Sequence, residues 1–142
     1  AALVHSKRHG ISPGDEVIVP AVSWSTTYFP LHQYGLKMRF VDIDQETLNL
    51  DLDELERAIT PSTRMVLAVN LLGNPIQFDR LLSICERHDL ILMEDNCEAM
   101  GATFEGKQAG TFGLVGTFSS FFSHHISTFK LKRLIGNTPT RS

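Results

Sequence analysis

The sequence predicts an α/β fold in which a mostly parallel sheet is flanked by helices. Short apolar runs alternate along the chain with polar or amphipathic stretches, which is typical of strands that are connected by helices. The apolar runs are continuous, and this indicates strands that are buried on both faces. With 142 residues, 42% of them hydrophobic, the chain can bury one modest core. We therefore expect one α/β unit.

Five apolar runs are expected to form the strands of the sheet. The first follows a turn signal at residues 12–15 and ends at Pro20. The third precedes a turn that contains Gly73. The expected strands are residues 17–19, 38–42, 65–69, 90–93 and 113–121.

Three segments between these runs are expected to be helical. Residues 24–34 should form the first helix, with a kink at Pro30 and an end at Gly35. Asp51 is placed to cap the second helix, with Glu54 at the capping-box position. The third helix is indicated by the spacing of Phe78, Leu81, Leu82 and Cys85.

Composition limits the classes of partner. A net charge of −3 at neutral pH does not favour nucleic acid or an anionic membrane. The sequence has no apolar run long enough to cross a bilayer and no signal peptide pattern. Cys85 and Cys97 have neither metal-ligand nor CxxC spacing, so we expect reduced thiols in a cytoplasmic protein and no metal site.

The two ends of the chain are unlike those of a complete domain. The chain starts without an initiator methionine, and its last residues are basic and polar without the pattern of a sheet. We expect residues 1–128 to be part of a larger domain. Residues 129–142 are expected to be an atypical tail, frameshifted or disordered.

Asp95 and Glu98 are the first candidate site residues. Asp95 follows a predicted buried strand, and in open α/β sheets ligands bind at the carboxyl ends of the strands. Glu98 would share a face with Asp95 if a helical turn begins there. On the residues alone, Asp95 fits a ligand-binding acid, a solvated loop acid or a helix cap.

Three further candidates lie near the ends of other predicted strands or just beyond them. Ser119 could donate a hydrogen bond to a phosphate, and His124 could act as a general base near neutral pH. Trp24 could stack on a planar cofactor or pack in the core. No glycine-rich phosphate motif is found, and His124 with His125 does not form a metal site.

The order of these segments resembles the large domain of fold-type I pyridoxal-phosphate enzymes, and more narrowly the nucleotide-sugar aminotransferase and dehydratase family. The matching stretches are residues 13–20, 40–44, 49–51, 70–75, 94–102 and 119–128. The resemblance implies that pyridoxal 5'-phosphate or pyridoxamine 5'-phosphate is the cofactor.

The resemblance also assigns roles to the candidate residues. Asp95 matches the acid that pairs with the pyridine nitrogen of the cofactor, and Trp24 matches the aromatic residue against the ring face. Ser119 matches a hydroxyl donor to the cofactor phosphate, and Glu98 matches a polar position near the ring. His124 stands where the aminotransferases of the family carry the lysine that bonds covalently to the cofactor.

A histidine at that position resembles the 3-dehydratases that act on nucleotide-linked 4-keto-6-deoxy sugars. The implied reaction removes the C3 hydroxyl with His124 as base, in deoxysugar and lipopolysaccharide biosynthesis. The family also implies a homodimer, and glutamate or an iron–sulfur partner that restores the cofactor. Two alternatives remain open: a sugar aminotransferase whose lysine comes from elsewhere, and a non-catalytic α/β fragment.

Overall fold

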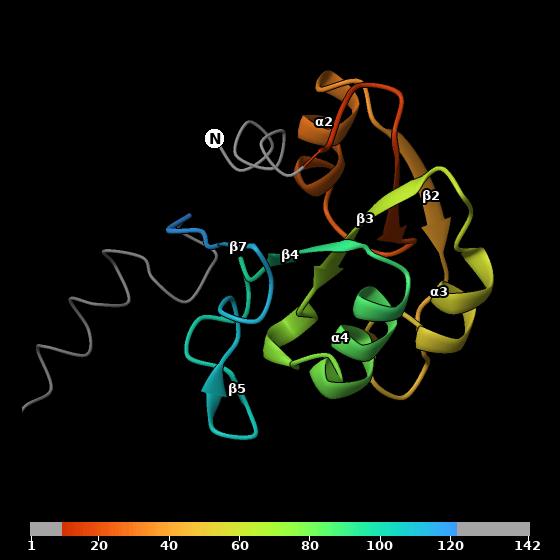
Figure 1. The fold of residues 1–142 in the computed structure, drawn as a ribbon. Coiled ribbons are helices and arrows are strands. Elements are labelled where there is room, and N and C mark those ends of the chain that lie inside the picture. The colour runs from red at the N-terminus through yellow and green to blue at the C-terminus, as the bar shows by residue number, and fades with distance from the viewer. Residues whose placement is uncertain (1–9, 122–142) are drawn as a thin grey trace, which may run out of the picture.

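The computed structural model describes residues 10–121, which form a five-stranded parallel sheet with helices on both faces (Figure 1). The strand order is β2-β1-β3-β4-β7. The sheet strands are β1 (Glu16–Pro20), β2 (Lys37–Val41), β3 (Thr63–Val69), β4 (Ile91–Asp95) and β7 (Val115–Thr117). The α-helices are α2 (Ser25–Gln33), α3 (Leu52–Ala58) and α4 (Phe78–Arg87). The predicted fold class is confirmed.

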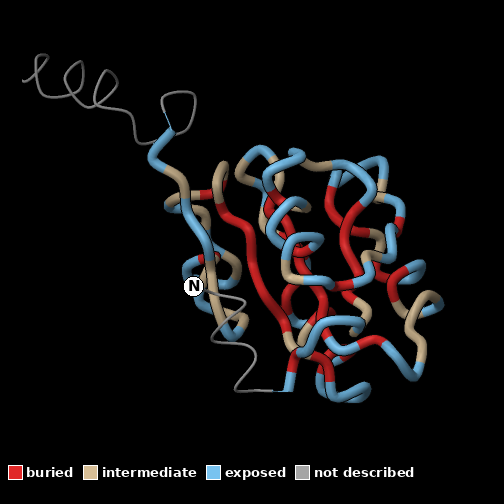
Figure 2. The backbone as a smooth tube through the Cα atoms, turned by 90° about the horizontal axis from the view of Figure 1, so that it is seen from above, coloured by how far each residue is buried: buried red, intermediate tan, exposed pale blue. Residues whose placement is uncertain are grey.

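Two clusters of buried side chains hold the helices against the sheet. On one face, Ile18, Val66 and Leu92 of the strands pack with residues of α3 and α4. On the other face, Val19 and Leu67 pack with residues that include Leu31 of α2. Successive strand residues point to opposite faces, so continuous apolar runs fill both clusters. The buried strands run through the middle of the molecule in Figure 2.

The expected helices are found with small changes in their bounds. Trp24 is the N-cap of α2, and the helix continues as one element through Pro30, where a kink was expected. Gly35 follows the helix with φ +84°, a left-handed conformation that favours glycine and ends the helix. Asp51 caps α3 by accepting from the backbone N–H groups of Asp53 and Glu54.

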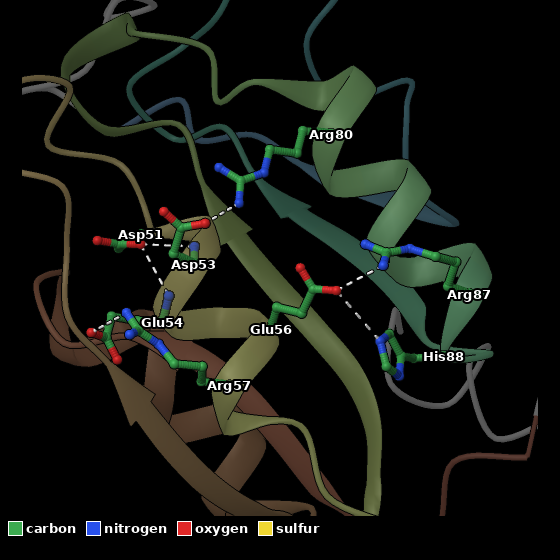
Figure 3. A network of polar contacts seen from close by, with 8 residues as sticks. All are labelled: Asp51, Asp53, Glu54, Glu56, Arg57, Arg80, Arg87 and His88. Atoms are coloured by element: carbon green, nitrogen blue, oxygen red, sulfur yellow. Dashed lines mark hydrogen bonds and ion pairs between the residues drawn. The ribbon is translucent and has the colours of Figure 1, made fainter.

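Charged side chains join α3 to α4 on the surface (Figure 3). Glu56 of α3 pairs with Arg87 of α4 at 2.8 Å, and Asp53 pairs with Arg80. Glu54 forms an ion pair with Arg57 in the same helix and does not complete the expected capping box. These are exposed pairs, and such pairs typically stabilise a fold by less than about 1 kcal/mol.

The structure corrects the predicted strands at two places. The strand expected over residues 113–121 is limited to β7, because Gly113 and Leu114 belong to the preceding loop. The fourth strand extends through Asp95, so this acid is the last residue of β4. The 3-10 turn η1 (Leu71–Gly73) and the hairpin β5 (Thr103–Phe104) to β6 (Lys107–Gln108) were not predicted.

The expectations for the tail and for membrane spans concern the whole chain, of which the structure describes residues 10–121. The tail expected over residues 129–142 lies beyond the described part of the chain. Among residues 10–121, none of the helices has the length and apolar character needed to span a bilayer.

Candidate functional site

The carboxyl ends of the parallel strands open onto a cavity of about 600 Å³. Three of the sequence-predicted site residues, Trp24, Asp95 and Ser119, line this cavity. They come from the start of α2, the end of β4 and the segment after β7. Glu98 reaches the site through a contact with Trp24. His124 lies outside the described residues.

Each carboxylate oxygen of Asp95 accepts a hydrogen bond at the end of β4. It is 8% exposed, and its Oδ2 accepts from the Thr27 hydroxyl at 2.9 Å. Its Oδ1 accepts from the backbone N–H of Cys97 at 3.1 Å. The cavity wall around the carboxylate is largely apolar and includes Leu67 and Met93. A carboxylate in such surroundings interacts strongly with a cation or a protonated ring nitrogen.

Trp24 presents its side chain at the mouth of the cavity. The side chain is 61% exposed, and its indole Nε1 donates to Glu98 Oε1 at 3.4 Å. Glu98 Oε2 accepts from the backbone N–H of Leu72 at 2.9 Å. Residues 96–101 form turns and not the helical turn that would place Asp95 and Glu98 on one face. Glu98 instead connects Trp24 to η1.

Ser119 lies beyond the end of β7 and is half-buried. Its Oγ accepts from the backbone N–H of Phe121 at 3.1 Å. Because a serine hydroxyl can donate and accept at once, this contact leaves its hydrogen able to point toward a ligand. The arrangement suits an anionic oxygen such as one of a phosphate.

Glu94 is a buried acid that the sequence analysis did not single out. It is 0% exposed, and its carboxylate accepts from the backbone N–H groups of Gly110 at 2.6 Å, Phe112 at 2.8 Å and Gly113 at 2.6 Å. These bonds hold the loop that precedes β7. The available signal was the position of a carboxylate directly after a buried apolar run, since buried charges require partners.

Gly116 allows β7 to lie close to the loop that precedes it, which contains Gly110. A Cβ atom on Gly116 would lie 2.3 Å from the carbonyl oxygen of Gly110, a distance that real Cβ contacts do not show. Glycine at this position and the bonds to Glu94 therefore fix the path of the chain toward Ser119.

Cys97 also lines the cavity, but its thiol is not activated. Burial, a hydrogen bond to Asp95 and the negative charges of Asp95 and Glu98 raise its pKa to about 12. A thiol with this pKa stays protonated at neutral pH and is a poor nucleophile. Within residues 10–121, no group of three or more histidine, cysteine or acidic side chains is arranged to hold a metal ion.

The site as a whole can bind a flat heteroaromatic ring that carries an anionic group. Asp95 offers a carboxylate to a ring nitrogen, Trp24 offers an aromatic face, and Ser119 offers a hydroxyl. A cavity of about 600 Å³ is within the usual size of a cofactor site. The residue types and their grouping therefore fit the cofactor that the sequence resemblance implies.

Comparison with known proteins gives a match along most of the chain. The model of the DegT/DnrJ/EryC1/StrS aminotransferase family matches residues 1–130. A GDP-4-keto-6-deoxy-D-mannose 3-dehydratase from Yersinia pseudotuberculosis is 65% identical over 92% of this chain and 33% of the relative.

Solved structures of the same kind of enzyme share the fold. A mutant GDP-4-keto-6-deoxymannose-3-dehydratase with bound GDP-perosamine has a TM-score of 0.84 and 61% identity, over 90% of this chain and 33% of that one. A structure of such an enzyme with a trapped PLP-glutamate geminal diamine has a TM-score of 0.83 and 61% identity, over 89% and 33%. The chain spans about a third of the length of the relatives that it matches.

Proposed function

Because the chain belongs to the DegT/DnrJ/EryC1/StrS aminotransferase family, we propose that the whole protein is a 3-dehydratase dependent on pyridoxal or pyridoxamine 5'-phosphate. Its substrate is a nucleotide-linked 4-keto-6-deoxy sugar, from which it removes the C3 hydroxyl. The product enters deoxysugar and lipopolysaccharide biosynthesis. The 65% identity to a GDP-4-keto-6-deoxy-D-mannose 3-dehydratase supports this substrate class.

The grouping of Asp95, Trp24 and Ser119 on one cavity is the observation that carries the proposal. Asp95 is assigned to the pyridine nitrogen of the cofactor, Trp24 to its ring face and Ser119 to its phosphate. Glu98 is assigned to the ring environment, where it holds the Trp24 indole. Residues 1–128 are then part of the cofactor-binding large domain. The bound cofactor supplies an electron sink for the carbon that loses a proton.

His124 is proposed as the catalytic base. An imidazole exchanges protons near neutral pH but cannot form the covalent link that a lysine forms with the cofactor. His124 lies five positions after Ser119 in the sequence. With the cofactor bound, the His124 ring would remove a proton at the aminomethyl carbon of the cofactor.

The proposed partners follow from the same assignment. They are the nucleotide sugar, glutamate as the amino donor and a second copy of the protein in a homodimer. A relative bound to a PLP-glutamate geminal diamine supports glutamate. A cytoplasmic location agrees with two free cysteines.

Borohydride reduction distinguishes this dehydratase from an aminotransferase of the same family. Reduction fixes a lysine-linked cofactor to the protein, and mass spectrometry of the whole protein detects the added mass. We expect no fixed cofactor on the wild type and a fixed cofactor on His124→Lys, with dehydration of GDP-4-keto-6-deoxymannose lost in the variant. Fixation on the wild type would favour the aminotransferase.

Thermal unfolding with pyridoxamine 5'-phosphate tests whether the cofactor binds at all. A ligand that binds the folded state raises the unfolding temperature by mass action. The rise should be lost in Asp95→Asn and retained in Asp79→Asn, which changes an exposed acid on α4. No rise with the wild type would leave the non-catalytic fragment as the remaining interpretation.

A further inference from the structure

Thr27 makes a buried contact with the acid of the proposed cofactor site. Its hydroxyl donates to Asp95 Oδ2 at 2.9 Å, and the two side chains are each 8% exposed. The two residues are 68 positions apart, so the contact depends on α2 packing against the end of β4. Thr27 was not among the sequence-predicted site residues, because a threonine within a helical segment carries no signal of this kind.

The Ser23 hydroxyl lies next to that of Thr27. Ser23 Oγ is 2.9 Å from Thr27 Oγ1. The one hydroxyl hydrogen of Thr27 is directed to Asp95, so Ser23 is the donor in this pair. The start of α2 thus orients the Thr27 hydroxyl before any ligand binds.

The second oxygen of Asp95 is restrained separately. Oδ1 accepts from the backbone N–H of Cys97 at 3.1 Å. Because the two oxygens have different donors, rotation of the carboxylate out of its plane would weaken both of these contacts. A carboxylate whose plane is already fixed binds a ring nitrogen more tightly, because it loses less rotational freedom when the ligand binds.

We propose that Thr27 is a positioning residue that holds the Asp95 carboxylate in the plane required by the ring nitrogen of the cofactor. Thr27 acts through Asp95 and is assigned no contact with the cofactor. This inference rests on the proposed function, because it needs Asp95 to meet that nitrogen. Beyond that function, it assigns to Thr27 part of the affinity of the site for the ring nitrogen.

The test compares two ligands that differ only at the ring nitrogen. One is pyridoxamine 5'-phosphate, and the other is its carbocyclic analogue, in which a C–H group replaces the nitrogen. Calorimetric titration of the whole protein gives a dissociation constant for each. The ratio of the two constants measures recognition of the nitrogen alone, because losses of packing or of phosphate binding affect both ligands.

Thr27→Val removes the hydroxyl but keeps the branched shape, and Thr27→Ser restores the hydroxyl. We expect the wild type and Thr27→Ser to prefer the natural ligand, and Thr27→Val to lose about tenfold of that preference, as for a hydrogen bond to a charged group. If the valine variant does not fold, Thr27→Ala replaces it, and we expect the same loss of preference.

Thr63→Val is the matched control. Thr63 is also a buried threonine that donates to a carboxylate, Glu16 Oε1 at 2.6 Å, but it lies at the start of β3, away from the cavity. This variant should lower the unfolding temperature and leave the ligand preference unchanged. A preference retained in Thr27→Val would overturn the inference alone. No preference in the wild type would overturn the assignment of Asp95 as well.

Discussion

The indole nitrogen of Trp24 lies 3.4 Å from Glu98 Oε1, although the two residues are 74 positions apart in the chain. The other oxygen of Glu98 accepts from the backbone of Leu72, which has φ +53° in the left-handed region. Glu98 therefore joins the start of α2 to the turn after β3. This connection restrains a tryptophan that would otherwise have an exposed and mobile side chain.

Replacing Glu98 should loosen the Trp24 indole. Trp24 is the single tryptophan among these 142 residues, so the fluorescence of this chain reports on the contact. Glu98→Ala should lower the fluorescence anisotropy and cost about 1 kcal/mol of folding free energy. Glu105→Ala, at an exposed position in the hairpin, is the control. Equal anisotropy in both variants would show that Glu98 does not restrain the indole.

The sequence predicts the layers of this fold better than its connections. Continuous apolar runs such as that of β3 identify buried strands, because a parallel sheet covered on both faces leaves no polar alternation. The motif residues Trp24, Asp95 and Ser119 could be placed at one edge by the same logic. Contacts such as Thr27 with Asp95 depend on packing between distant elements, and no local spacing indicates them.

Glu94 should be important for stability, because its carboxylate accepts from three backbone N–H groups in the loop before β7. Glu94→Gln replaces an acceptor oxygen with an NH₂ group that faces these donors. We expect a loss of about 2–3 kcal/mol in the free energy of unfolding, measured with urea. Glu86→Gln, at an exposed position on α4, should change it by less than about 0.5 kcal/mol. Equal losses in the two variants would contradict this role.

Glu16 should make stability depend on acid pH. Its pKa is lowered from 4.5 chiefly by the hydrogen bond with Arg39, and also by bonds from Thr63 and Thr60. A lowered folded-state pKa gives stabilisation that is present above 4.5 and is lost as the pH falls through the folded-state value.

The measurement for Glu16 is urea unfolding of the wild type and Glu16→Gln across acid pH. At neutral pH the variant should be less stable by about 1–2 kcal/mol, and the difference should shrink as the pH falls below the unfolded-state pKa. Glu54→Gln, which changes an exposed acid with a surface ion pair, is the control. A difference that stays constant down to acid pH would mean that ionisation of Glu16 is not the cause.

The two thiols should resist alkylation in the folded protein. Burial raises the pKa of Cys85 from 9.0 to about 11, and burial with the nearby acids raises that of Cys97 to about 12. Since the thiolate is the reactive form, iodoacetamide at mildly alkaline pH should label each cysteine at least about tenfold more slowly than in urea. Peptide mass spectrometry separates the two sites.

The same shifts predict how stability changes in alkali. A raised folded-state pKa leaves stability unaffected below the unfolded value of 9.0 and lowers it as the pH rises toward the folded values of about 11 and about 12, because only the unfolded thiols ionise in that interval. Cys97→Ala should reduce this loss, and Cys85→Ala should reduce it separately. If Cys97 reacts in the folded protein as fast as in urea, its pKa is not raised by burial and by the acids Asp95 and Glu98.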